Sequence, residues 1–304
     1  MRFMIIAGGS LGSAGAREEM RIYMHEATWL TIRDTQIYVE VAGDGPQILC
    51  VHTAGQSGVQ YREVLQRLPS LGYQVVVMDL PGHGRSLPAS GGAITDLHDY
   101  AEYCWSVVEQ LSLNNPVILG CSIGGKIVLD LCVHHGDDIR AAIAMEADGH
   151  NGALSVAGLR RSMSDAASPS QGDRTYFGTL ASLGVAVPTA RAEVIAQMHR
   201  REDTVITSSD LIGWTTHDVS EALAGVRCRL LVVAGSDDFW VREENCRLVA
   251  NAVMNGSFLR LEGTGHYPME ELADFPELLA TWLQVLLEKS RVSATSNRKR
   301  ENNG

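Results

Sequence analysis

The chain has 304 residues and a formal net charge of −11, with 45% hydrophobic and 20% charged residues. That balance is typical of a folded globular protein and excludes a largely disordered chain. The acidic charge, with no basic stripe in the folded region, argues against a nucleic-acid partner, and no apolar stretch is long enough for a transmembrane helix. We therefore expect a small-molecule ligand and neither nucleic acid nor a membrane as partner.

The chain begins with a segment that carries little structural signal. Residues 1–24 combine a short apolar start with a stretch rich in glycine, serine and alanine. The apolar part is too short, and too poor in positive charge, for a secretion signal. We expect residues 1–24 to be disordered or an extension of the reading frame, and the protein to be cytoplasmic.

Strand-like runs then follow one another along the chain. Residues 29–33 and 36–41 predict a hairpin with its turn at Asp34-Thr35. From residue 48 onward, short continuous apolar runs alternate with helical stretches; these runs are 48–51, 75–78, 117–119, 141–145, 230–234 and 258–261. Continuous apolarity marks strands covered on both faces, so the pattern predicts a parallel sheet with helices on both sides.

Two helices stand out by their apolar spacing. Between Asp96 and Leu113, apolar and aromatic residues recur at helical intervals, with Thr95 as the expected cap. The closing helix, from Leu272 to Leu286, repeats this stripe. Beyond it, residues 289–304 have no apolar periodicity and are expected to form a disordered tail.

A serine between glycines follows the run at 117–119. The stretch Gly120-Cys121-Ser122-Ile123-Gly124 reads G-x-S-x-G between a strand and a helical segment, which is the setting of a nucleophile elbow. Such a turn exposes the serine hydroxyl beside a helix N-terminus, whose free N–H groups can face an oxyanion. We therefore expect Ser122 to be a nucleophile; the alternative is an ordinary serine in a strand-to-helix turn.

The alternation of strands and helices is interrupted between residues 148 and 218. This stretch carries helical patterns, most clearly over 190–201, but no strong strand. An insertion here would emerge at the carboxyl ends of the strands, where α/β sheets bind ligands. We expect 148–218 to be a helical lid on a core formed by 25–147 and 219–288; the alternative is a structural decoration without ligand contact.

A serine nucleophile needs a histidine base, which in turn needs a carboxylate. In chains with this elbow the order is serine, acid, histidine. His266 lies in a loop after the last predicted strand, at the edge of the sheet where the elbow also lies. The other histidines after Ser122 are expected to end the elbow helix or to belong to the insertion: His134, His135, His150, His199 and His217.

Three carboxylates compete for the role of the acid. Asp237 and Asp238 lie in the turn after the run at 230–234, and the G-x-x-D spacing from Gly235 favours Asp238, with Asp237 as a cap. Glu146, just after the run at 141–145, is the third candidate because that strand also ends at the site.

Taken together, five motifs in this order resemble the α/β-hydrolase superfamily over about residues 29–288. They are His52-Thr53-Ala54-Gly55, the loop from Asp79 to Ser86, the Ser122 elbow, the turn from Gly235 to Asp238, and Gly265-His266. The resemblance implies an α/β fold with an eight-stranded, mostly parallel sheet flanked by helices and a helical lid between strands six and seven. It also implies Ser122 as nucleophile, Asp238 as acid and His266 as base, with the N–H groups of Ala54 and Ile123 as the oxyanion hole.

Thr53 departs from this resemblance, because the superfamily usually has glycine there. The loop from Asp79 to Ser86 is expected to brace the structure and not to take part in catalysis.

The expected function is that of a serine hydrolase, a carboxylic ester hydrolase acting on a small or medium substrate through an acyl-enzyme. The motifs are similar to those of monoalkyl phthalate and enol-lactone hydrolases. A carbon-carbon bond hydrolase or lactonase of aromatic catabolism, and a non-catalytic ligand-binding receptor of this fold, are the alternatives. Apolar residues near the motifs are expected to line the substrate pocket: Trp214, Phe239, Trp240, Tyr267 and Met269.

The sequence gives little sign of a metal or a cofactor. It has no H-E-x-x-H motif, and its six cysteines form no C-x-x-C pair or zinc-like group, which favours reduced thiols. We expect neither a metal nor a cofactor. A homodimer is left open.

Overall fold

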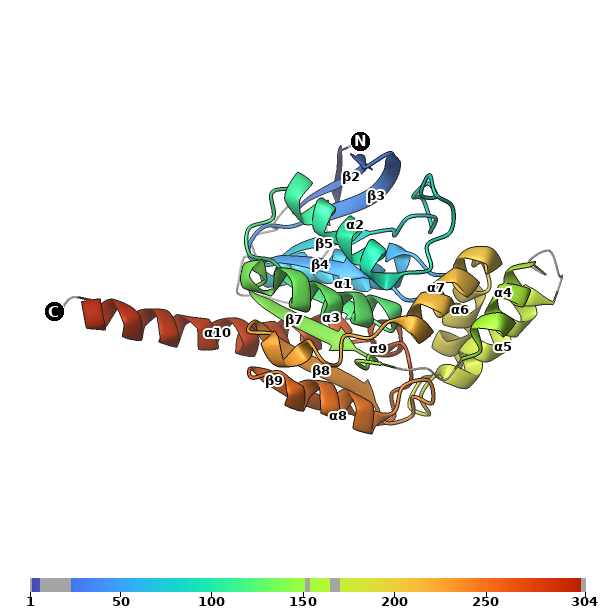
Figure 1. The fold of residues 1–304 in the computed structure, drawn as a ribbon. Coiled ribbons are helices and arrows are strands. Elements are labelled where there is room, and N and C mark those ends of the chain that lie inside the picture. The colour runs from blue at the N-terminus through green and yellow to red at the C-terminus, as the bar shows by residue number, and fades with distance from the viewer. Residues whose placement is uncertain (1, 6–22, 151–153, 165–169, 302–304) are drawn as a thin grey trace, which may run out of the picture.

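The computed structural model describes residues 2–5, 23–150, 154–164 and 170–301 (Figure 1). Within them, nine strands form one sheet in the order β1-β2-β3-β5-β4-β6-β7-β8-β9. Their bounds are β1 Arg2–Ile5, β2 Tyr23–Ile32, β3 Thr35–Ala42, β4 Gln47–Val51, β5 Gln74–Met78, β6 Val117–Cys121, β7 Ala141–Met145, β8 Arg229–Gly235 and β9 Gly256–Leu261. The predicted fold class, a mostly parallel sheet flanked by helices, is confirmed.

The eight predicted strands correspond to β2 through β9, and β1 is an additional strand. It pairs antiparallel with β2, with Arg2 opposite Glu26. It falls in the segment where we expected no regular structure. A strand of four residues has too little pattern of its own to be predicted, and it forms against the free edge that β2 offers. Most of the remaining segment, residues 6–22, lies outside the described residues.

The centre of the sheet explains where a ligand site can form. Strand β4 pairs in parallel with β5 on one side and with β6 on the other, so the chain changes direction across the sheet at β4. Ligands of open α/β sheets bind at such a switch point, beyond the carboxyl ends of the strands. Val51 at the end of β4 lies opposite Gly120 near the end of β6, which brings the loops after these two strands together.

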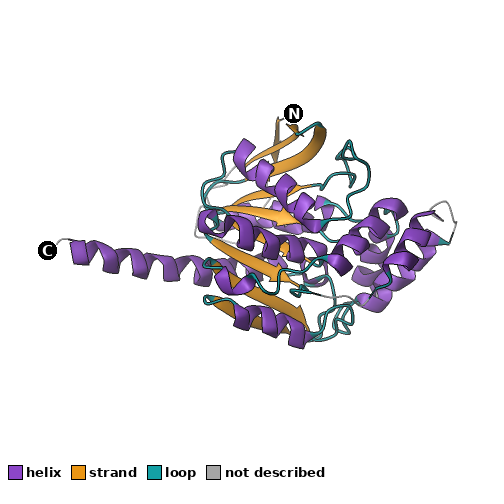
Figure 2. Cartoon of the chain, viewed as in Figure 1, coloured by secondary structure: helices purple, strands orange, loops and turns teal. Residues whose placement is uncertain are grey.

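Helices cover both faces of the sheet (Figure 2). Alternate residues of a strand point to opposite faces: Leu49 belongs to the core cluster under α2 and α3, and Ile48 to the cluster under α1 and α10. The bounds are α1 Arg62–Arg67, α2 Leu97–Gln110, α3 Ile123–His135, α8 Glu243–Ala252, α9 Pro268–Glu271 and α10 Phe275–Glu301, with short 3-10 turns η1 Gly58–Tyr61, η2 Leu68–Leu71, η3 Gly136–Asp138 and η4 Leu223–Gly225.

Two helix ends differ from the prediction. The cap of α2 is Asp96 and not Thr95: the Asp96 carboxylate accepts a hydrogen bond of 3.0 Å from the His98 N–H. A carboxylate is also favoured there by the helix dipole. At the other end of the chain, α10 continues to Glu301, where we expected a tail from residue 289. No proline or glycine stands between residues 289 and 301 to end the helix.

Four helices lie between β7 and β8, in the predicted insertion. They are α4 Val156–Ser164, α5 Gln171–Ser182, α6 Thr189–His199 and α7 Thr204–Thr216. Figure 1 shows them gathered beyond one end of the sheet, and α7 contacts both α2 and α3 of the core. The insertion therefore stands over the strand ends where β4 and β6 finish.

Two further observations concern the described part of the chain as a whole. The six cysteines are buried and carry free thiols. Among the described helices, none combines the length and the apolarity that crossing a bilayer requires.

Candidate active site

Ser122 lies in a sharp turn between β6 and α3. Its backbone angles are φ 58° and ψ −119°, a strained conformation for a residue other than glycine. A Cβ added at Gly120 would lie 2.2 Å from the Gly124 carbonyl oxygen, and one at Gly124 would lie 2.3 Å from the Val51 oxygen. Because neither position has room for a side chain, the two glycines permit the turn that holds Ser122 at the start of α3.

His266 and Asp238 meet at the same edge of the sheet. His266 Nδ1 donates a hydrogen bond of 2.7 Å to Asp238 Oδ2, and Asp238 Oδ1 accepts one of 2.7 Å from the Trp240 N–H. Burial by itself would raise the pKa of Asp238, but the His266 ring holds that pKa below its usual value. With the Nδ1 proton donated to Asp238, Nε2 is the ring nitrogen that can accept a proton.

The competing carboxylates occupy other positions. Asp237 Oδ2 accepts a hydrogen bond of 2.8 Å from the Val185 N–H, so it caps a loop of the insertion. Glu146 is buried behind Asp238 and accepts a bond of 2.6 Å from the Gly235 N–H. Burial and the charge of Asp238 raise the pKa of Glu146 well above its usual value. A protonated Glu146 is poorly suited to orient a histidine as an acceptor.

The remaining histidines after Ser122 have other partners. His134 and His135 lie in the last turn of α3, and His135 stacks on Trp105. His217 Nε2 contacts Asp130 Oδ2 at 3.0 Å, and His150 pairs at the surface with Asp218. His199, from α6, lines the same cavity as Ser122.

The loop after β4 carries Ala54 and is anchored on both sides of that residue. Gln60 Oε1 accepts hydrogen bonds from the Thr53 N–H, at 2.9 Å, and from Thr53 Oγ1, at 3.1 Å. Thr53, where the superfamily usually has glycine, therefore ties the loop to η1. The Gly55 N–H donates a bond of 2.8 Å to Asp210 Oδ2 on α7.

The second predicted oxyanion donor is the Ile123 N–H. Ile123 is the first residue of α3, in the turn whose amides have no partner within the helix. Val51 and Gly120 lie opposite each other in the β4–β6 ladder, so the loop with Ala54 and the start of α3 follow neighbouring strand ends.

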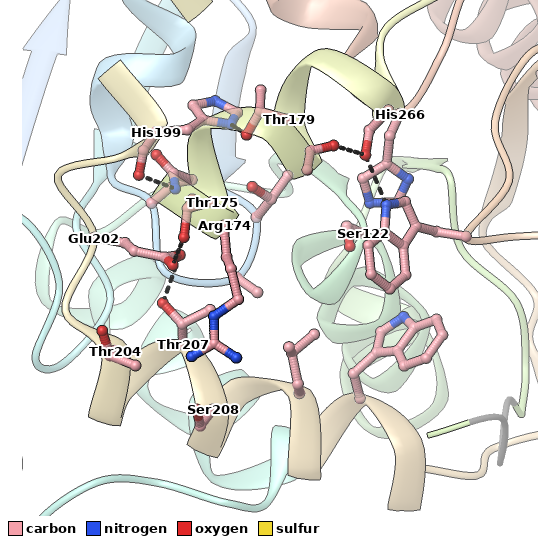
Figure 3. Close-up of a pocket in the computed structure, with 18 of the residues that line it drawn as sticks. Ser122, Arg174, Thr175, Thr179, His199, Glu202, Thr204, Thr207, Ser208 and His266 are labelled. Carbon is pink, nitrogen blue, oxygen red and sulfur yellow. Dashed lines mark hydrogen bonds between the residues drawn. The ribbon is translucent and has the colours of Figure 1, made fainter. Parts of the chain in front are cut away.

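A cavity of about 390 Å³ opens between the core and the insertion (Figure 3). Ser122, His266 and Ala54 line it together with residues of α5, α6 and α7. In the view of Figure 3, Ser122 and His266 lie on one side of the cavity and Arg174, Glu202 and Thr207 on the other.

Three of the predicted pocket residues, Trp214, Trp240 and Tyr267, line this cavity. Two do not. Phe239 is 58% exposed and stacks on the outer face of the turn against Trp240, whereas Met269 is buried in the core beneath α10. Phe239 lies at the turn between β8 and α8, and this turn directs it to solvent.

The polar side of the cavity was not predicted from the sequence. Glu202 accepts hydrogen bonds from Thr175 Oγ1 and, at 2.8 Å, from Thr207 Oγ1. Burial raises the pKa of Glu202 above its usual value. His199 Nε2 contacts Glu270 Oε2 at 2.6 Å. No motif marks these residues, because single polar side chains on helices and in the loop between α6 and α7 are usually at the surface.

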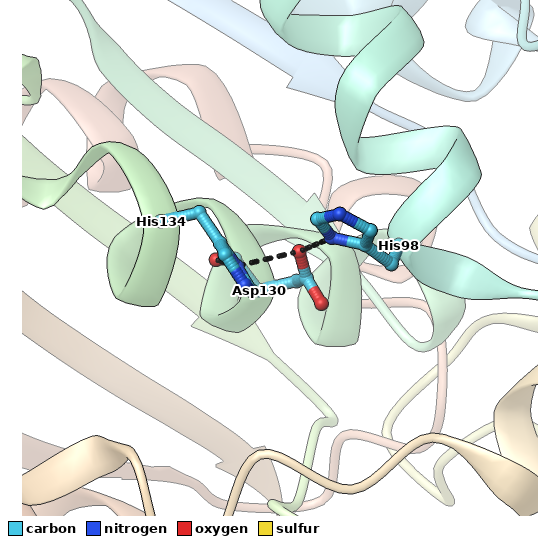
Figure 4. A group of neighbouring side chains, drawn as sticks. All are labelled: His98, Asp130 and His134. Atoms are coloured by element: carbon cyan, nitrogen blue, oxygen red, sulfur yellow. Dashed lines mark hydrogen bonds and ion pairs between the residues drawn. The ribbon is translucent and has the colours of Figure 1, made fainter.

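One group of side chains among the described residues has the composition of a metal site: His98, Asp130 and His134 (Figure 4). Its members lie on α2 and in the second half of α3, and none of them lines the cavity of Ser122. Hydrogen bonds already account for their arrangement. His98 Nδ1 lies 2.8 Å from Asp130 Oδ1, and His134 Nδ1 lies 3.0 Å from the Asp130 carbonyl oxygen.

Known proteins of similar sequence match parts of this chain. The Magnesium-chelatase 30 kDa subunit of Rhodobacter capsulatus is 37% identical over 90 residues, which are 30% of this chain and 31% of that protein. A pimeloyl-acyl-carrier-protein methyl ester esterase of Vibrio vulnificus is 26% identical over 114 residues, 36% of this chain and 40% of that protein. This chain therefore matches less than half of the length of each of these relatives.

Solved structures agree with the fold. A thermophilic esterase from Thermogutta terrifontis superposes with a TM-score of 0.75 at 19% identity, covering 87% of this chain and 98% of that one. At this identity the likeness shows the fold alone. A model of the Alpha/beta hydrolase family matches residues 48–282, well over half of the chain. That range includes Ser122, Asp238 and His266, and the chain belongs to the Alpha/beta hydrolase family.

Proposed function

We propose that the protein is a serine hydrolase that cleaves a carboxylic ester of a small or medium organic substrate through an acyl-enzyme. The observation that carries this proposal is the 2.7 Å hydrogen bond between His266 and Asp238 at a cavity that Ser122 also lines. A positioned histidine and a serine hydroxyl that a substrate in the cavity can reach are the minimum for nucleophilic acyl transfer.

In the first half of the reaction, Ser122 Oγ attacks the ester carbonyl carbon while His266 Nε2 takes the hydroxyl proton. The carbonyl electron pair moves to oxygen and gives a tetrahedral oxyanion. When this intermediate collapses, the bond to the leaving alcohol breaks, and His266 returns the proton to that alcohol. The product of this half is an ester between the acyl group and Ser122.

In the second half, water attacks the same carbonyl carbon while His266 takes one of its protons. Collapse of the new oxyanion breaks the bond to Ser122 Oγ, which regains the proton from His266, and the carboxylic acid leaves. Asp238 keeps the Nδ1 proton in place and stabilises the imidazolium that forms in both halves.

The N–H groups of Ala54 and Ile123 are the proposed donors to both oxyanions. Ile123 contributes an amide at a helix N-terminus, where the dipole also favours negative charge. Such donors stabilise the transition state more than the ground state, so they act on kcat and little on KM.

In this proposal, the insertion determines the substrate specificity. Helices α5, α6 and α7 contribute Thr175, His199 and Ser208, among others, to the cavity wall. We propose that residues 148–218 act as a lid that shapes the acyl or alcohol site. A cavity of about 390 Å³ suits a small or medium ester, which supports this size class.

The decisive experiment compares the wild type with Ser122→Ala on p-nitrophenyl esters, lactones and a coloured ring-fission dienoate. We expect ester hydrolysis by the wild type and a loss of kcat by roughly 10⁴-fold or more in the variant, with unchanged circular dichroism. Ser106→Ala removes a serine hydroxyl from α2, outside the cavity, and serves as the matched control, with activity retained.

The result also separates the alternatives. Preference for the lactone or the dienoate would change the substrate class while keeping the nucleophile. A folded wild type that hydrolyses nothing in the panel and resists a fluorophosphonate probe would overturn the proposal in favour of a binding protein.

A further inference from the structure

Asp210, in the middle of α7, is a fully buried carboxylate that receives hydrogen bonds from three other segments. Its Oδ2 accepts from the Gly55 N–H at 2.8 Å and lies 2.8 Å from His83 Nε2. Its Oδ1 accepts from the Tyr100 hydroxyl at 2.8 Å. The loops after β4 and β5 and the helix α2 thus meet at one side chain of the insertion.

The protonation of His83 follows from its two contacts. Nε2 faces the Asp210 carboxylate, and Nδ1 lies 3.1 Å from the Pro81 carbonyl oxygen. Both partners are acceptors, so both ring nitrogens carry a proton and His83 is an imidazolium. Burial alone would lower the pKa of His83, but the Asp210 carboxylate raises it above its usual value. Asp210 and His83 therefore form a buried ion pair.

The neighbouring ring of His52 differs from His83 in its protonation state. Its Nε2 accepts a hydrogen bond of 3.0 Å from the Leu80 N–H, so the proton is on Nδ1, which donates to the Thr53 carbonyl oxygen at 2.8 Å. Burial and the nearby His83 charge lower the pKa of His52 to about 4. His52 is therefore neutral and holds the Thr53 carbonyl.

The loop with Ala54 is also pressed against α7. Gly55 has φ +67°, and a Cβ added there would lie 2.1 Å from Thr207 Oγ1 and 2.7 Å from Glu202 Oε2. Only glycine permits both this backbone conformation and this close approach. The contact between Gly55 and Asp210 is therefore made where the loop has no room to shift toward the insertion.

These contacts hold the backbone on both sides of Ala54. The Thr53 N–H and carbonyl are held by Gln60 and His52, and the Gly55 N–H is held by Asp210. Ala54 stands between the two anchored residues and lines the cavity beside Ser122. The direction of its N–H is set by the anchors on either side, and Asp210 is the anchor that comes from the insertion.

We propose that Asp210 is a positioning residue for ester hydrolysis, which fixes the Ala54 N–H in the oxyanion hole by holding Gly55 from the lid helix α7. The inference rests on the proposed function. It makes docking of α7 a condition for a complete oxyanion hole, so the insertion contributes to turnover as well as to the shape of the pocket.

The test compares Asp210→Ala and Asp210→Asn with Tyr100→Phe. Tyr100→Phe is the matched control because it removes a buried hydrogen bond of 2.8 Å to the same carboxylate but leaves Gly55 and His83 bonded. Each variant is assayed on an ester and on the corresponding thionoester, whose sulfur is a weak hydrogen-bond acceptor. The ratio of the two rates reports the strength of the oxyanion hole.

We expect Asp210→Ala to lower kcat on the ester by about 10- to 100-fold with KM within about threefold, because a misplaced oxyanion donor acts on the transition state. The rate ratio of ester to thionoester should fall toward one. Asp210→Asn keeps the size and one acceptor oxygen and should lie between the wild type and Asp210→Ala. Tyr100→Phe should keep kcat within about threefold and an unchanged ratio.

Several outcomes would overturn the inference. The first is a folded Asp210→Asn whose rate ratio of ester to thionoester equals that of the wild type. Such a result, even with lowered stability, would mean that Asp210 has a purely structural role. Equal losses of kcat in Tyr100→Phe and the Asp210 variants would be another. If Asp210→Ala does not fold, Asp210→Asn still decides. A wild type that hydrolyses no ester would instead overturn the proposed function.

Discussion

At the scale of single residues, two carboxyl groups lie close together behind the imidazole of His266 and have opposite pKa shifts. The His266 ring keeps the pKa of Asp238 below its usual value, while burial and Asp238 raise that of Glu146. Two buried carboxylates cannot both be charged at low cost, so one takes the charge and the other keeps its proton. Glu146 can then donate to Asp238 while its other oxygen accepts from the Gly235 N–H.

This assignment predicts how stability depends on pH in Glu146→Gln. A raised carboxyl pKa means that the folded wild type holds a proton that the unfolded chain has lost. Its free energy of unfolding therefore falls as pH rises above the usual glutamate pKa, by up to about 1.4 kcal/mol per pH unit. Glutamine stays neutral and can make the same two hydrogen bonds. We expect the stability of Glu146→Gln relative to the wild type to increase from pH 5 to pH 8.

Urea denaturation at the two pH values measures this difference. Glu221→Gln, at an exposed position, is the control and should show no such increase. A stability difference for Glu146→Gln that does not change with pH would mean that Glu146 is ionised in the folded protein.

At the scale of elements, a buried ion pair ties the elbow helix α3 to the segment after β7. Lys126 Nζ lies 2.9 Å from Asp148 Oδ1, and both side chains are almost fully buried. Lys126 follows Ser122 by one turn of α3, and its ammonium group lies 5.7 Å from the centre of the Trp214 ring on α7. Burial lowers the pKa of Lys126, and Asp148 opposes that shift.

Removing one partner of this pair should cost more than removing both. Lys126→Met leaves the Asp148 carboxylate buried without its cation, and we expect the free energy of unfolding to fall by roughly 3–5 kcal/mol. Adding Asp148→Asn should recover part of that loss, since no charge then remains buried. A double-mutant cycle by urea denaturation gives the coupling. Simple additivity of the two single losses would contradict a paired, buried charge.

At the scale of the whole molecule, three pairs of buried carboxylate and histidine fasten the insertion to the core. Asp130 contacts His217 at 3.0 Å, Glu270 contacts His199 at 2.6 Å, and Asp210 contacts His83 at 2.8 Å. Burial would raise the pKa values of Asp130 and Glu270, but their histidine partners keep both below the usual values. The docking of the insertion thus depends on ionised carboxylates.

The sign of the pH dependence follows from these lowered pKa values. A carboxylate with a depressed pKa contributes stability that is present above its unfolded pKa, about 4, and is lost as pH falls through its folded pKa. We expect amide-exchange protection in α6 and α7 to be lost below about pH 4 before that of β4 to β8. Glu270→Gln should weaken this protection at pH 7 and make its acid dependence shallower.

Hydrogen exchange measured by mass spectrometry between pH 7 and pH 3 compares the protection of α6 and α7 with that of the sheet. The rates are corrected for the intrinsic exchange rate at each pH. Loss of protection in the sheet and the insertion at the same pH would show that acid unfolds the molecule as one unit and would refute the prediction.

Local patterns in the sequence were sufficient for much of this structure. Continuous apolar runs predicted β4 to β8 because strands covered on both faces need apolar residues at nearly every position, and a weaker apolar run predicted the half-exposed edge strand β9. The glycines around Ser122 indicated the elbow because the turn excludes a Cβ at two places. The G-x-x-D spacing favoured Asp238, and the loop after the last predicted strand indicated His266; the structure brings these two side chains into hydrogen-bond contact.

Local patterns were insufficient where a residue's role depends on a distant partner. Phe239 and Met269 have the composition of pocket residues, yet one faces solvent and the other the core. Glu202, in the loop between α6 and α7, and Asp210, on α7, look like ordinary polar residues, although the first lines the cavity and the second is fully buried.

By itself, the sequence determined the fold class and the position of the sharp turn at Ser122, since periodicity and turn chemistry act over a few residues, and the resemblance to a family added Asp238 and His266 as predictions. Only the tertiary structure decided that Asp210 holds Gly55, a partner 155 residues away, and that Glu146 faces Asp238. Such contacts leave no local pattern, because a buried polar side chain is satisfied by whichever distant group the packing of the elements brings to it.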